Sequence, residues 1–393
     1  MRTHKGLDMD VILVEILPRL PAKTLIRFKS VCKSLNSVIS SRDFVRLYLR
    51  HQSLSPSATD KCLILAGHHR INCYQFDQHA TTTPTTFVYS KTSRHEELAV
   101  IGTSNGLLCI RLIKENFSEF SILNPTTRNY RCIRTLHEEL GVGHSYGFGF
   151  DHVNLDYIIV VVSDHHNNSA VKTRITSVYS LNKNSWSVVN EIAVAATDTV
   201  EAVRRYGVLI DNNLLHWMSW IPELRKHRIG CFDICKNKWT DDVLLPQFYY
   251  DLTWQKKIRI VDFGVVDDCL FLTFMDRIEK RDDVWVMKEY GVQESWVRLL
   301  SIPDFNCFQI RGGINLVACC QSSDTVLVRL RYSSRLFWHN KVDGGHSEAK
   351  FDVAPDFWDN IHAYMCSRSL VHLPGGQLFE HSEALCKSST DSL

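Results

Sequence analysis

The sequence predicts a mainly β protein, in which a six-bladed β-propeller follows a small α-helical module. Three observations support this prediction. Apolar residues recur every three or four positions only within the first 50 residues, which is helical spacing. From about residue 61, apolar and polar residues alternate, with enrichment in β-branched and aromatic side chains, as is typical of strands. Within this second region an aromatic residue recurs at intervals of 56, 53, 57 and 55 residues.

The length and composition limit the class of protein. A chain of 393 residues is long enough for two or three domains, or for one large repeat fold with an appendage. With 45% hydrophobic and 22% charged residues, it has an ordinary globular composition, which excludes a disordered or collagen-like chain. No stretch of 18 uninterrupted apolar residues occurs, so we expect no membrane span. The 13 cysteines lack regular spacing, and we expect reduced thiols and a cytoplasmic or nuclear location.

The helical module is assigned to residues 8–50. Ile12, Ile16 and Leu20 are spaced by four and predict a first amphipathic helix. Pro21 occupies a position where proline can open a second helix. Short helices of this total length cannot bury their aliphatic surface among themselves. The module therefore completes its core against a partner or, as the alternative, packs as a cap on the rest of the chain.

The charge of the chain is unevenly distributed. The first 50 residues contain ten basic and four acidic residues, whereas the remainder contains 35 basic and 39 acidic residues. A basic module on a faintly acidic body favours a negatively charged partner, either an acidic protein or nucleic acid. A DNA-binding helix-turn-helix is thus an alternative. Against it, Arg and Lys are spread through the helices and do not gather on one recognition helix.

The body is predicted to consist of repeated four-stranded units. Residues 51–60 are assigned to a linker, residues 61–375 to the propeller and residues 376–393 to a polar tail. Each repeat contains two hairpins, and five such repeats lie between about residues 98 and 353. The period of this chain is slightly longer than that of kelch repeats, which is about 50 residues. The strands in 61–77 and 361–373 lie at opposite ends of the body and together complete a sixth blade. The recurring aromatic residues are Tyr130, Trp186, Trp239, Trp296 and Phe351.

The module resembles an F-box. The segment from Glu15 to Leu35 matches nearly every fixed position of the pattern E-I-L-x-R-L-P-x-K-x-L-x-R-F-x-x-V-C-K-x-W, although Leu35 stands in place of the final Trp. The usual Leu-Pro before the first helix is not cleanly present around residues 7–9. This variant of the F-box opens a large family of plant F-box proteins.

The body resembles the F-box-associated, kelch-like domain of the same plant family. The matching segments are 102–110, 122–128, 146–151 and 283–296, in the expected order. The whole chain is also similar to the S-locus F-box proteins of self-incompatibility, but no feature separates those from their relatives. The resemblance implies a non-catalytic, substrate-recognition subunit of a cullin-based (SCF-type) ubiquitin ligase. Its implied partners are a Skp-type adaptor, through it a cullin, and an unidentified target protein, with neither nucleic acid nor membrane.

On this resemblance the adaptor would bind apolar residues of the module, with lysines accelerating the encounter through charge complementarity. The expected adaptor-binding residues are Ile16, Pro21, Leu25, Phe28, Val31, Cys32 and Leu35, with Lys23, Lys29 and Lys33.

The target is expected to bind the propeller face that carries the long connections between hairpins. In an up-and-down blade the hairpin turns lie on one face, while the connections between hairpins and between blades lie on the other. The turns are mostly short and the connections long, and long loops on a rigid scaffold often carry recognition. The expected target-binding residues are His144, His165, His166, Trp220, Arg225, His227, Tyr249, Tyr250, Trp254, Arg277 and Phe305.

Enzymatic motifs are not evident, and no cofactor or metal is predicted. The glycine-rich segment 141–149 has no glycine at the third position of a dinucleotide-binding fingerprint, and a strand is expected after it where the fingerprint needs a helix. Cys231 and Cys235 have no second ligand pair at zinc-finger spacing, and we expect them to be buried strand residues. A propeller-fold hydrolase or oxidase stays open as an alternative, because a sequence cannot show which side chains converge on the central channel.

Overall fold

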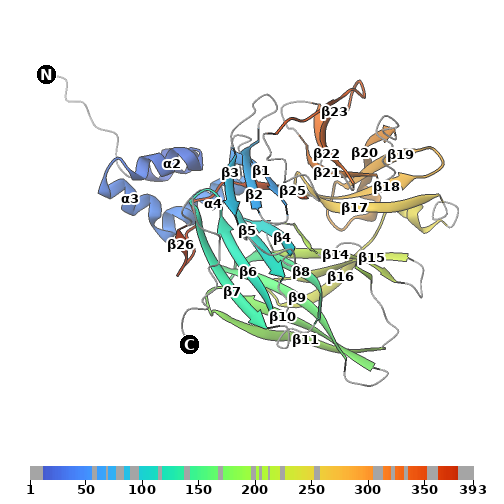
Figure 1. Ribbon diagram of the computed structural model, residues 1–393, viewed down its shortest axis with the longest axis horizontal. Helices are drawn as coiled ribbons and strands as arrows, with labels where there is room; N and C mark the ends of the chain where they lie inside the picture. Colours follow the sequence, from blue (N-terminus) through green and yellow to red (C-terminus); the bar gives the residue numbers. More distant parts are fainter. Residues whose placement is uncertain are drawn as a thin grey trace.

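The structure, a computed structural model, forms six antiparallel sheets arranged as the blades of a propeller, with helices at one end (Figure 1). This confirms the predicted fold class. The structure describes residues 12–54, 60–67, 70–76, 84–88, 97–113, 117–136, 142–166, 171–195, 201–202, 206–210, 213–221, 226–251, 257–303, 313–319, 324–331, 335–351 and 362–378.

The blades are numbered here around the ring. Blade 1 consists of β25 (His362–Ser367), β1 (Lys61–Ala66), β2 (Arg70–Gln75) and β3 (Thr85–Val88). Blade 2 consists of β4 (Glu97–Ser104), β5 (Leu107–Ile113), β6 (Phe117–Asn124), β7 (Asn129–Leu136) and a short added strand, β26 (Gln377–Leu378). Blade 3 consists of β8 (Val142–Asp151), β9 (Asp156–His166), β10 (Val171–Ser180) and β11 (Ser185–Ala195).

The second half of the ring repeats this pattern. Blade 4 consists of β12 (Glu201–Ala202), β13 (Val208–Ile210), β14 (Leu214–Ile221), β15 (Lys226–Asp233) and β16 (Lys238–Val243). Blade 5 consists of β17 (Ile258–Val266), β18 (Cys269–Asp276), β19 (Arg281–Met287) and β20 (Trp296–Pro303). Blade 6 consists of β21 (Ile314–Cys319), β22 (Thr325–Leu330), β23 (Leu336–Asn340) and β24 (His346–Glu348). Two short 3₁₀ turns, η4 (Gln247–Tyr250) and η5 (Gln293–Ser295), lie in the connections.

Blade 1 closes the ring by joining the two ends of the body. Its inner strand β25 pairs antiparallel with β1, with Cys366 opposite Cys62. The predicted sixth blade, assembled from strands at opposite ends of the body, is therefore confirmed. The segment after β25 continues along blade 2, where the Asn124 Nδ2 donates hydrogen bonds to the carbonyl oxygens of Ser369, at 3.1 Å, and Val371, at 2.7 Å. We call residues 362–378 the closing segment.

The recurring aromatic residues connect neighbouring blades. The indole N–H of Trp186 in blade 3 donates to Thr135 Oγ1 of blade 2 at 3.0 Å, and that of Trp239 in blade 4 donates to Thr176 Oγ1 of blade 3 at 3.1 Å. In blade 5, the indole N–H of Trp296 donates a hydrogen bond to the carbonyl oxygen of Leu244, which follows the last strand of blade 4. The three tryptophans of the series thus attach the outer strands of blades 3, 4 and 5 to the blade before each of them.

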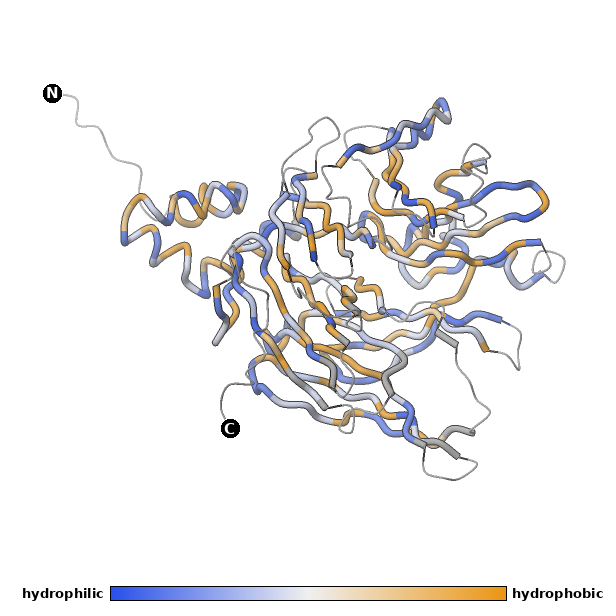
Figure 2. The backbone as a smooth tube through the Cα atoms, in the orientation of Figure 1, coloured by the Kyte–Doolittle hydropathy of each residue, from blue (hydrophilic) through white to orange (hydrophobic). Residues whose placement is uncertain are grey.

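The hydrophobic core lies between the blades. One buried cluster joins Phe120 and Ile122 of blade 2 to Phe148 and Ile159 of blade 3, and similar clusters lie between the other blades. Hydrophobic residues concentrate along the central strands, whereas the outer turns are mostly hydrophilic (Figure 2). The central strands of the blades therefore bury apolar side chains on the faces that meet adjacent blades, as stacked sheets require.

The strand directions divide the propeller into two faces. Neighbouring strands in every blade are antiparallel, and the isolated bridge between Tyr146 and Tyr206 is parallel, so the inner parts of blades 3 and 4 run the same way. The turns within hairpins therefore emerge on one side, the short-turn face. The connections between hairpins and between blades emerge on the other, the long-connection face. Two described turns depart from this division by length. The turn 288–295 is long but lies on the short-turn face, and the connection 277–280 is short but lies on the long-connection face.

The N-terminal module consists of helical turns η1 (Ile12–Ile16) and η2 (Leu17–Arg19), followed by α2 (Ala22–Lys29), α3 (Lys33–Ser40) and α4 (Arg42–Leu54). The first element is shorter than the predicted amphipathic helix because Pro18 interrupts it and η1 is a π-type turn. Pro21 precedes α2, as expected. Helix α4 continues past residue 50 into the segment assigned to the linker. No helix in the described ranges is long and apolar enough to span a membrane.

The module rests on the short-turn face through one buried carboxylate. The Asp60 Oδ2 accepts hydrogen bonds from the Tyr48 hydroxyl at 2.9 Å and from the Ala22 backbone N–H, at the start of α2, at 3.1 Å. The Asp60 carbonyl accepts from the Arg368 N–H at 2.7 Å. Leu370 of the closing segment completes the hydrophobic core of the module. The module therefore packs on the body, as the cap alternative stated.

One cysteine differs from the expectation of reduced thiols. Cys132 in β7 is disulfide-bonded. The other cysteines in the described residues are free thiols, as expected from their irregular spacing. The strand β26 lies at the start of the segment assigned to the polar tail and pairs with β7 at Tyr130 and Asn129. The chain beyond residue 375 thus still contributes to a blade.

We predict that the Trp239–Thr176 hydrogen bond stabilises the contact between blades 3 and 4 by about 1 kcal/mol. In a double-mutant cycle with Trp239→Phe and Thr176→Val, the double variant should cost about 1 kcal/mol less unfolding free energy than the two single variants added together. Denaturant unfolding monitored by fluorescence measures each value. Strict additivity of the two changes would show that the bond contributes nothing.

Candidate functional site

An aromatic cluster occupies the long-connection face at the junction of blades 4 and 5. Trp220 at the end of β14 pairs with His227 at the start of β15, and their ring centroids lie 4.8 Å apart. Tyr249 in η4 lies 5.9 Å from His227 and 5.8 Å from Tyr250, again between ring centroids. Four of the residues expected from sequence to bind the target therefore form one row, which we call the aromatic cluster.

A histidine–tyrosine contact holds this cluster together. The His227 Nδ1 lies 2.7 Å from the Tyr249 hydroxyl, which also accepts a hydrogen bond from the His227 backbone N–H at 3.2 Å. Burial lowers the pKa of His227 to about 4, and the Arg259 guanidinium contributes in the same direction. The His227 ring is therefore neutral at neutral pH.

The cluster combines a buried anchor with an accessible surface. Tyr249 is only 4% exposed, whereas Tyr250 is 37% exposed, and Trp220 and His227 are half-buried. The Tyr250 hydroxyl accepts a hydrogen bond from the Leu245 N–H at 3.3 Å, which fixes its ring. Rigid aromatic side chains that are partly exposed are characteristic of interaction hot spots. The arrangement can bind a protein surface by apolar contact and by hydrogen bonds at the ring edges.

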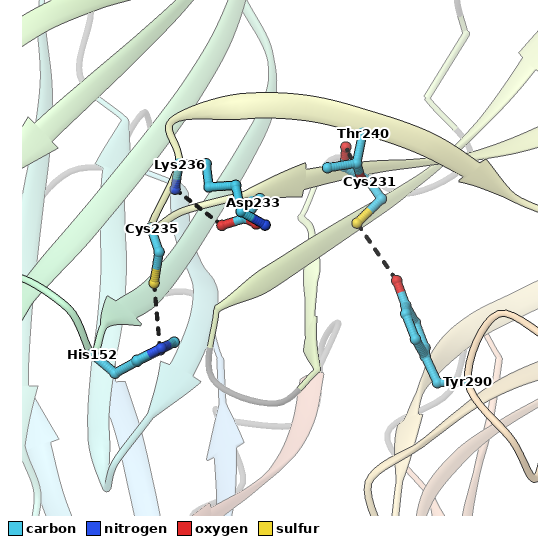
Figure 3. Close-up of polar contacts among 7 residues, drawn as sticks. All are labelled: His152, Cys231, Asp233, Cys235, Lys236, Thr240 and Tyr290. Atoms are coloured by element: carbon cyan, nitrogen blue, oxygen red, sulfur yellow. Dashed lines mark hydrogen bonds and ion pairs between the residues drawn. The ribbon is translucent and has the colours of Figure 1, made fainter.

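Cys231 and Cys235 are predicted from the sequence to be buried strand residues. Cys231 is buried in β15, as predicted, but Cys235 is only half-buried and lies in the turn after that strand, on the short-turn face. Cys235 lies with its Sγ 3.4 Å from His152 Nδ1 of blade 3, while Cys231 points to the Tyr290 hydroxyl of blade 5 at 3.6 Å (Figure 3). The two thiols thus face different neighbours. Across the residues that the structure describes, no group of three or more His, Cys, Asp or Glu side chains could hold a metal ion.

The Cys235 thiol is also poorly suited to nucleophilic chemistry. Burial raises its pKa, and the nearby Asp151 carboxylate contributes in the same direction. A reactive cysteine requires a stabilised thiolate. In the adjoining turn, the Lys236 Nζ donates to Asp233 Oδ2 at 2.7 Å (Figure 3). The Lys236 ammonium lowers the pKa of the Asp233 carboxyl, against the effect of burial, which raises it. These contacts stabilise the turn.

The helical module presents a second accessible apolar surface. Val31, between α2 and α3, is 68% exposed, and Val14 and Ile16 in η1 are 49% and 40% exposed. The lysines at positions 23 and 33 are exposed on the same module. The module thus retains accessible apolar and basic side chains after it has packed on the propeller.

Comparison with known proteins identifies both parts of the chain. A family model described as the F-box domain matches residues 10–47, and one described as the F-box associated beta propeller domain matches residues 62–370. The chain is 27% identical to the F-box protein CPR1 of Arabidopsis thaliana, over 84% of this chain and 81% of that protein. It is 26% identical to an F-box/kelch-repeat protein of the same plant, At3g23880, over 85% of this chain and 87% of that one.

The chain belongs to the plant F-box proteins with an F-box-associated domain. The resemblance deduced from the sequence motifs is thereby confirmed. Among solved structures, the chain is similar to the uncharacterized protein lmo1340 from Listeria monocytogenes EGD-e. That similarity has a TM-score of 0.34 and 14% identity, and it covers 70% of this chain and 86% of that protein.

The residues predicted to bind an adaptor occupy different depths of the F-box. Leu25 is fully buried in its core, and Pro21, Phe28 and Leu35 are partly buried. The Cys32 side chain is exposed and caps α3, accepting a hydrogen bond from the Leu35 N–H. These five residues therefore contribute to the packing and capping of the F-box as well as to its surface.

The remaining predicted adaptor residues are more accessible. Ile16, Val31, Lys23 and Lys33 are exposed, whereas Lys29 is half-buried. Burial lowers the pKa of the Lys29 ammonium. Direct contact with a partner is therefore easiest at Ile16 and Val31.

The predicted target-binding residues of the F-box-associated domain are only partly brought together. Trp220, His227, Tyr249 and Tyr250 form the aromatic cluster, while Arg277 is exposed in the turn after β18 on the same face. Arg225, Trp254 and Phe305 lie outside the described residues.

Three predicted histidines belong to strands and not to loops. His144 lies in β8, and His165 and His166 lie at the end of β9, opposite Thr173 and Lys172 of β10. The connection expected to carry His165 and His166 is therefore shorter than predicted, because the hairpin of β9 and β10 extends further than the alternation of apolar residues suggested. The His165 Nε2 lies 3.3 Å from Ser163 Oγ of its own strand.

Sequence reasoning missed Arg259, whose charge acts on His227 from β17. No local signal identifies it, because the contact depends on how blades 4 and 5 pack together. It also missed Asp60 and Leu370, which attach the F-box to the propeller. Asp60 stands directly before the first strand of the body and 38 residues after the helix start that it caps, so no local motif identifies it.

We predict that His227 makes the protein less stable in acid. Its pKa is about 4 in the folded state and near 6.5 in the unfolded chain, so the unfolded state binds the proton first as the pH falls. The unfolding free energy of the wild type should therefore fall by about 1–2 kcal/mol more than that of His227→Asn between pH 7 and pH 5. Urea unfolding at each pH measures the difference. Parallel pH profiles for the two proteins would contradict the assignment.

Proposed function

We propose that this protein is the substrate-recognition subunit of an SCF-type ubiquitin ligase. Its F-box would bind a Skp-type adaptor, and its propeller would bind the protein to be ubiquitylated. The observation that carries the proposal is the joining of an F-box and an F-box-associated propeller in one chain, with an accessible surface on each. In this scheme the protein acts by bringing its partners together, in the cytoplasm or the nucleus, and needs no cofactor.

The F-box surface suits an acidic, apolar-binding adaptor. Burying a large aliphatic side chain is favourable by about 1.5–3 kcal/mol, and Ile16 and Val31 are available for such burial. The exposed Lys23 and Lys33 would accelerate association with an acidic partner and would contribute less to the final affinity.

The placement of the F-box favours the long-connection face for the target. The F-box rests on the short-turn face through Asp60 and Leu370, so an adaptor bound there leaves the opposite face open. The aromatic cluster lies on that opposite face. The contact of Tyr48 with Asp60 makes the connection between the two parts stiff, which would hold the target at a defined distance from the ligase.

We predict that Val31→Glu weakens adaptor binding at least tenfold, because it places a charge in the apolar contact and opposes an acidic partner. Val342→Glu is the matched control, since Val342 is also highly exposed, at 77%, but lies in a turn of blade 6. Co-purification of the full chain with a Skp-type adaptor, followed by calorimetry, measures the affinity. An equal loss for both variants would contradict the assigned surface.

The wild-type result of this experiment also separates the alternatives. If the wild-type chain does not bind the adaptor but binds duplex DNA in a salt-sensitive manner, it is a DNA-binding protein. If it binds neither the adaptor nor DNA and catalyses the conversion of a small molecule, it is an enzyme.

A second prediction concerns the target-binding face. Trp220→Ala combined with Tyr250→Ala should abolish capture of the target and leave adaptor binding unchanged. Lys183→Glu combined with Lys236→Glu, in turns of the opposite face, should leave both unchanged. Cross-linking of the intact complex in plant extract, with quantitative mass spectrometry, identifies proteins lost only from the first variant. If the target is instead lost only from the Lys183→Glu, Lys236→Glu variant, the target binds the short-turn face.

A further inference from the structure

The outer strand of blade 3 has an open edge. Strand β11 spans 11 residues, Ser185–Ala195, and pairs with β10. In the part of the chain that the structure describes, no strand pairs with its other edge, and β11 forms the lower rim of the propeller in Figure 1. Such an edge presents a row of backbone N–H and C=O groups that can pair with another chain.

The outer strands of the other blades are protected in recognisable ways. β3 and β24 are only 4 and 3 residues long. β16 carries three charged residues, and β20 carries Arg298 and ends at Pro303. β7 carries two arginines and is partly covered by β26. Charges, proline, short length, a covering strand and a β-bulge are the usual protections of an edge. Of these, β11 has a bulge at Val189, and beyond it residues 190–195 pair with β10 in regular register.

The sequence of β11 is suited to pairing. It contains no Lys, Arg or Pro, and Glu191 is its only charged residue. Val188 is 58% exposed and Ile192 is 45% exposed. The consecutive residues Glu191, Ile192 and Ala193 are all exposed, and since successive side chains point to opposite faces, both faces of the strand are accessible there. The far end of the β10–β11 hairpin therefore stands clear of the neighbouring blades.

We propose that β11 is a docking edge, to which an extended segment of the recruited target adds as a further strand of blade 3. This inference rests on the proposed function. The strand runs from the short-turn face to the long-connection face, where it ends at Ala195, so a segment bound along it leads onto the face assigned to the target. Backbone hydrogen bonds would supply affinity, as in other cases of strand addition.

The exposed side chains define the chemistry of the segment. Val188 and Ile192 favour β-branched or apolar residues opposite them, because such cross-strand pairs stabilise a sheet. Glu191 favours a Lys or Arg opposite it. Because the bulge at Val189 places Val188 and Ile192 on opposite faces of the strand, the occupant is an extended segment with β-branched residues on both faces and a basic residue near its centre.

A second copy of this chain fits the edge less well. Two β11 strands paired alone would meet along roughly 35 Å of edge. A contact of that length and about 10 Å in width buries on the order of 700 Å² in total, whereas stable dimers bury about 1,200–2,000 Å². A single segment of a target needs only a transient contact and can continue onto the neighbouring face.

The test uses the full chain and a synthetic peptide of 12 residues, in which Thr and Val alternate around one central Lys. Fluorescence anisotropy should show binding of this peptide. The same peptide with N-methyl groups on both edges cannot add to a sheet and should not bind. Val188→Lys combined with Ile192→Lys should weaken binding at least tenfold. Val297→Lys, the matched control on the exposed side of β20, should leave it unchanged.

A charge exchange gives a second measurement. Glu191→Lys should weaken binding of the lysine peptide and strengthen binding of the same peptide with a central Glu. The proposal is overturned if the lysine peptide fails to bind, if the methylated peptide binds equally, or if the variants in β11 behave as Val297→Lys does. A wild-type dimer that the β11 variant converts to a monomer would assign the edge to a second copy. None of these outcomes depends on the adaptor, so failure here is distinct from failure of the proposed function.

Discussion

Closure of the ring by the pairing of β25 with β1 is the constraint on which the rest of this structure depends. A series of blades has two loose ends until its terminal strands meet, and here the ends lie some 300 residues apart, with Cys62 opposite Cys366. The pairing also fixes the closing segment against blade 2. There, Gly106 adopts a φ of +76° and a Cβ on it would lie 2.3 Å from Ser369 Cβ, so the hairpin turn must carry glycine to admit the segment.

The same closure determines where the F-box lies. Asp60 stands immediately before β1, and Leu370 follows β25, so both residues are brought to the short-turn face by the pairing of these strands. Asp60 then accepts hydrogen bonds from α2 and α4 together. A module that could not bury its own apolar surface thereby gains a core without covering Ile16 and Val31. The strand pairing that closes the ring therefore also sets the orientation of the F-box.

The two faces differ in what they can do chemically. On the short-turn face, the Asp233 carboxylate accepts hydrogen bonds from the Lys236 backbone N–H and ammonium, and burial raises the pKa of the Cys235 thiol. On the long-connection face, the neutral His227 and its tyrosine partner provide a stiff surface without a formal charge. The two faces therefore differ in charge and in the side chains that they make accessible.

The sequence by itself determined the class of fold, the number of blades and the family. Apolar spacing reports which face of a helix or strand is buried, and the period of Trp186, Trp239 and Trp296 reports the repeated attachment of one blade to the previous one. These signals are local or periodic, so a sequence preserves them. Only the tertiary structure decided that His165 belongs to a strand, that Arg259 acts on His227, and that Asp60 and Leu370 attach the F-box. Such contacts join residues far apart in the chain, and their free energy arises only after the blades have packed, so no local pattern encodes them.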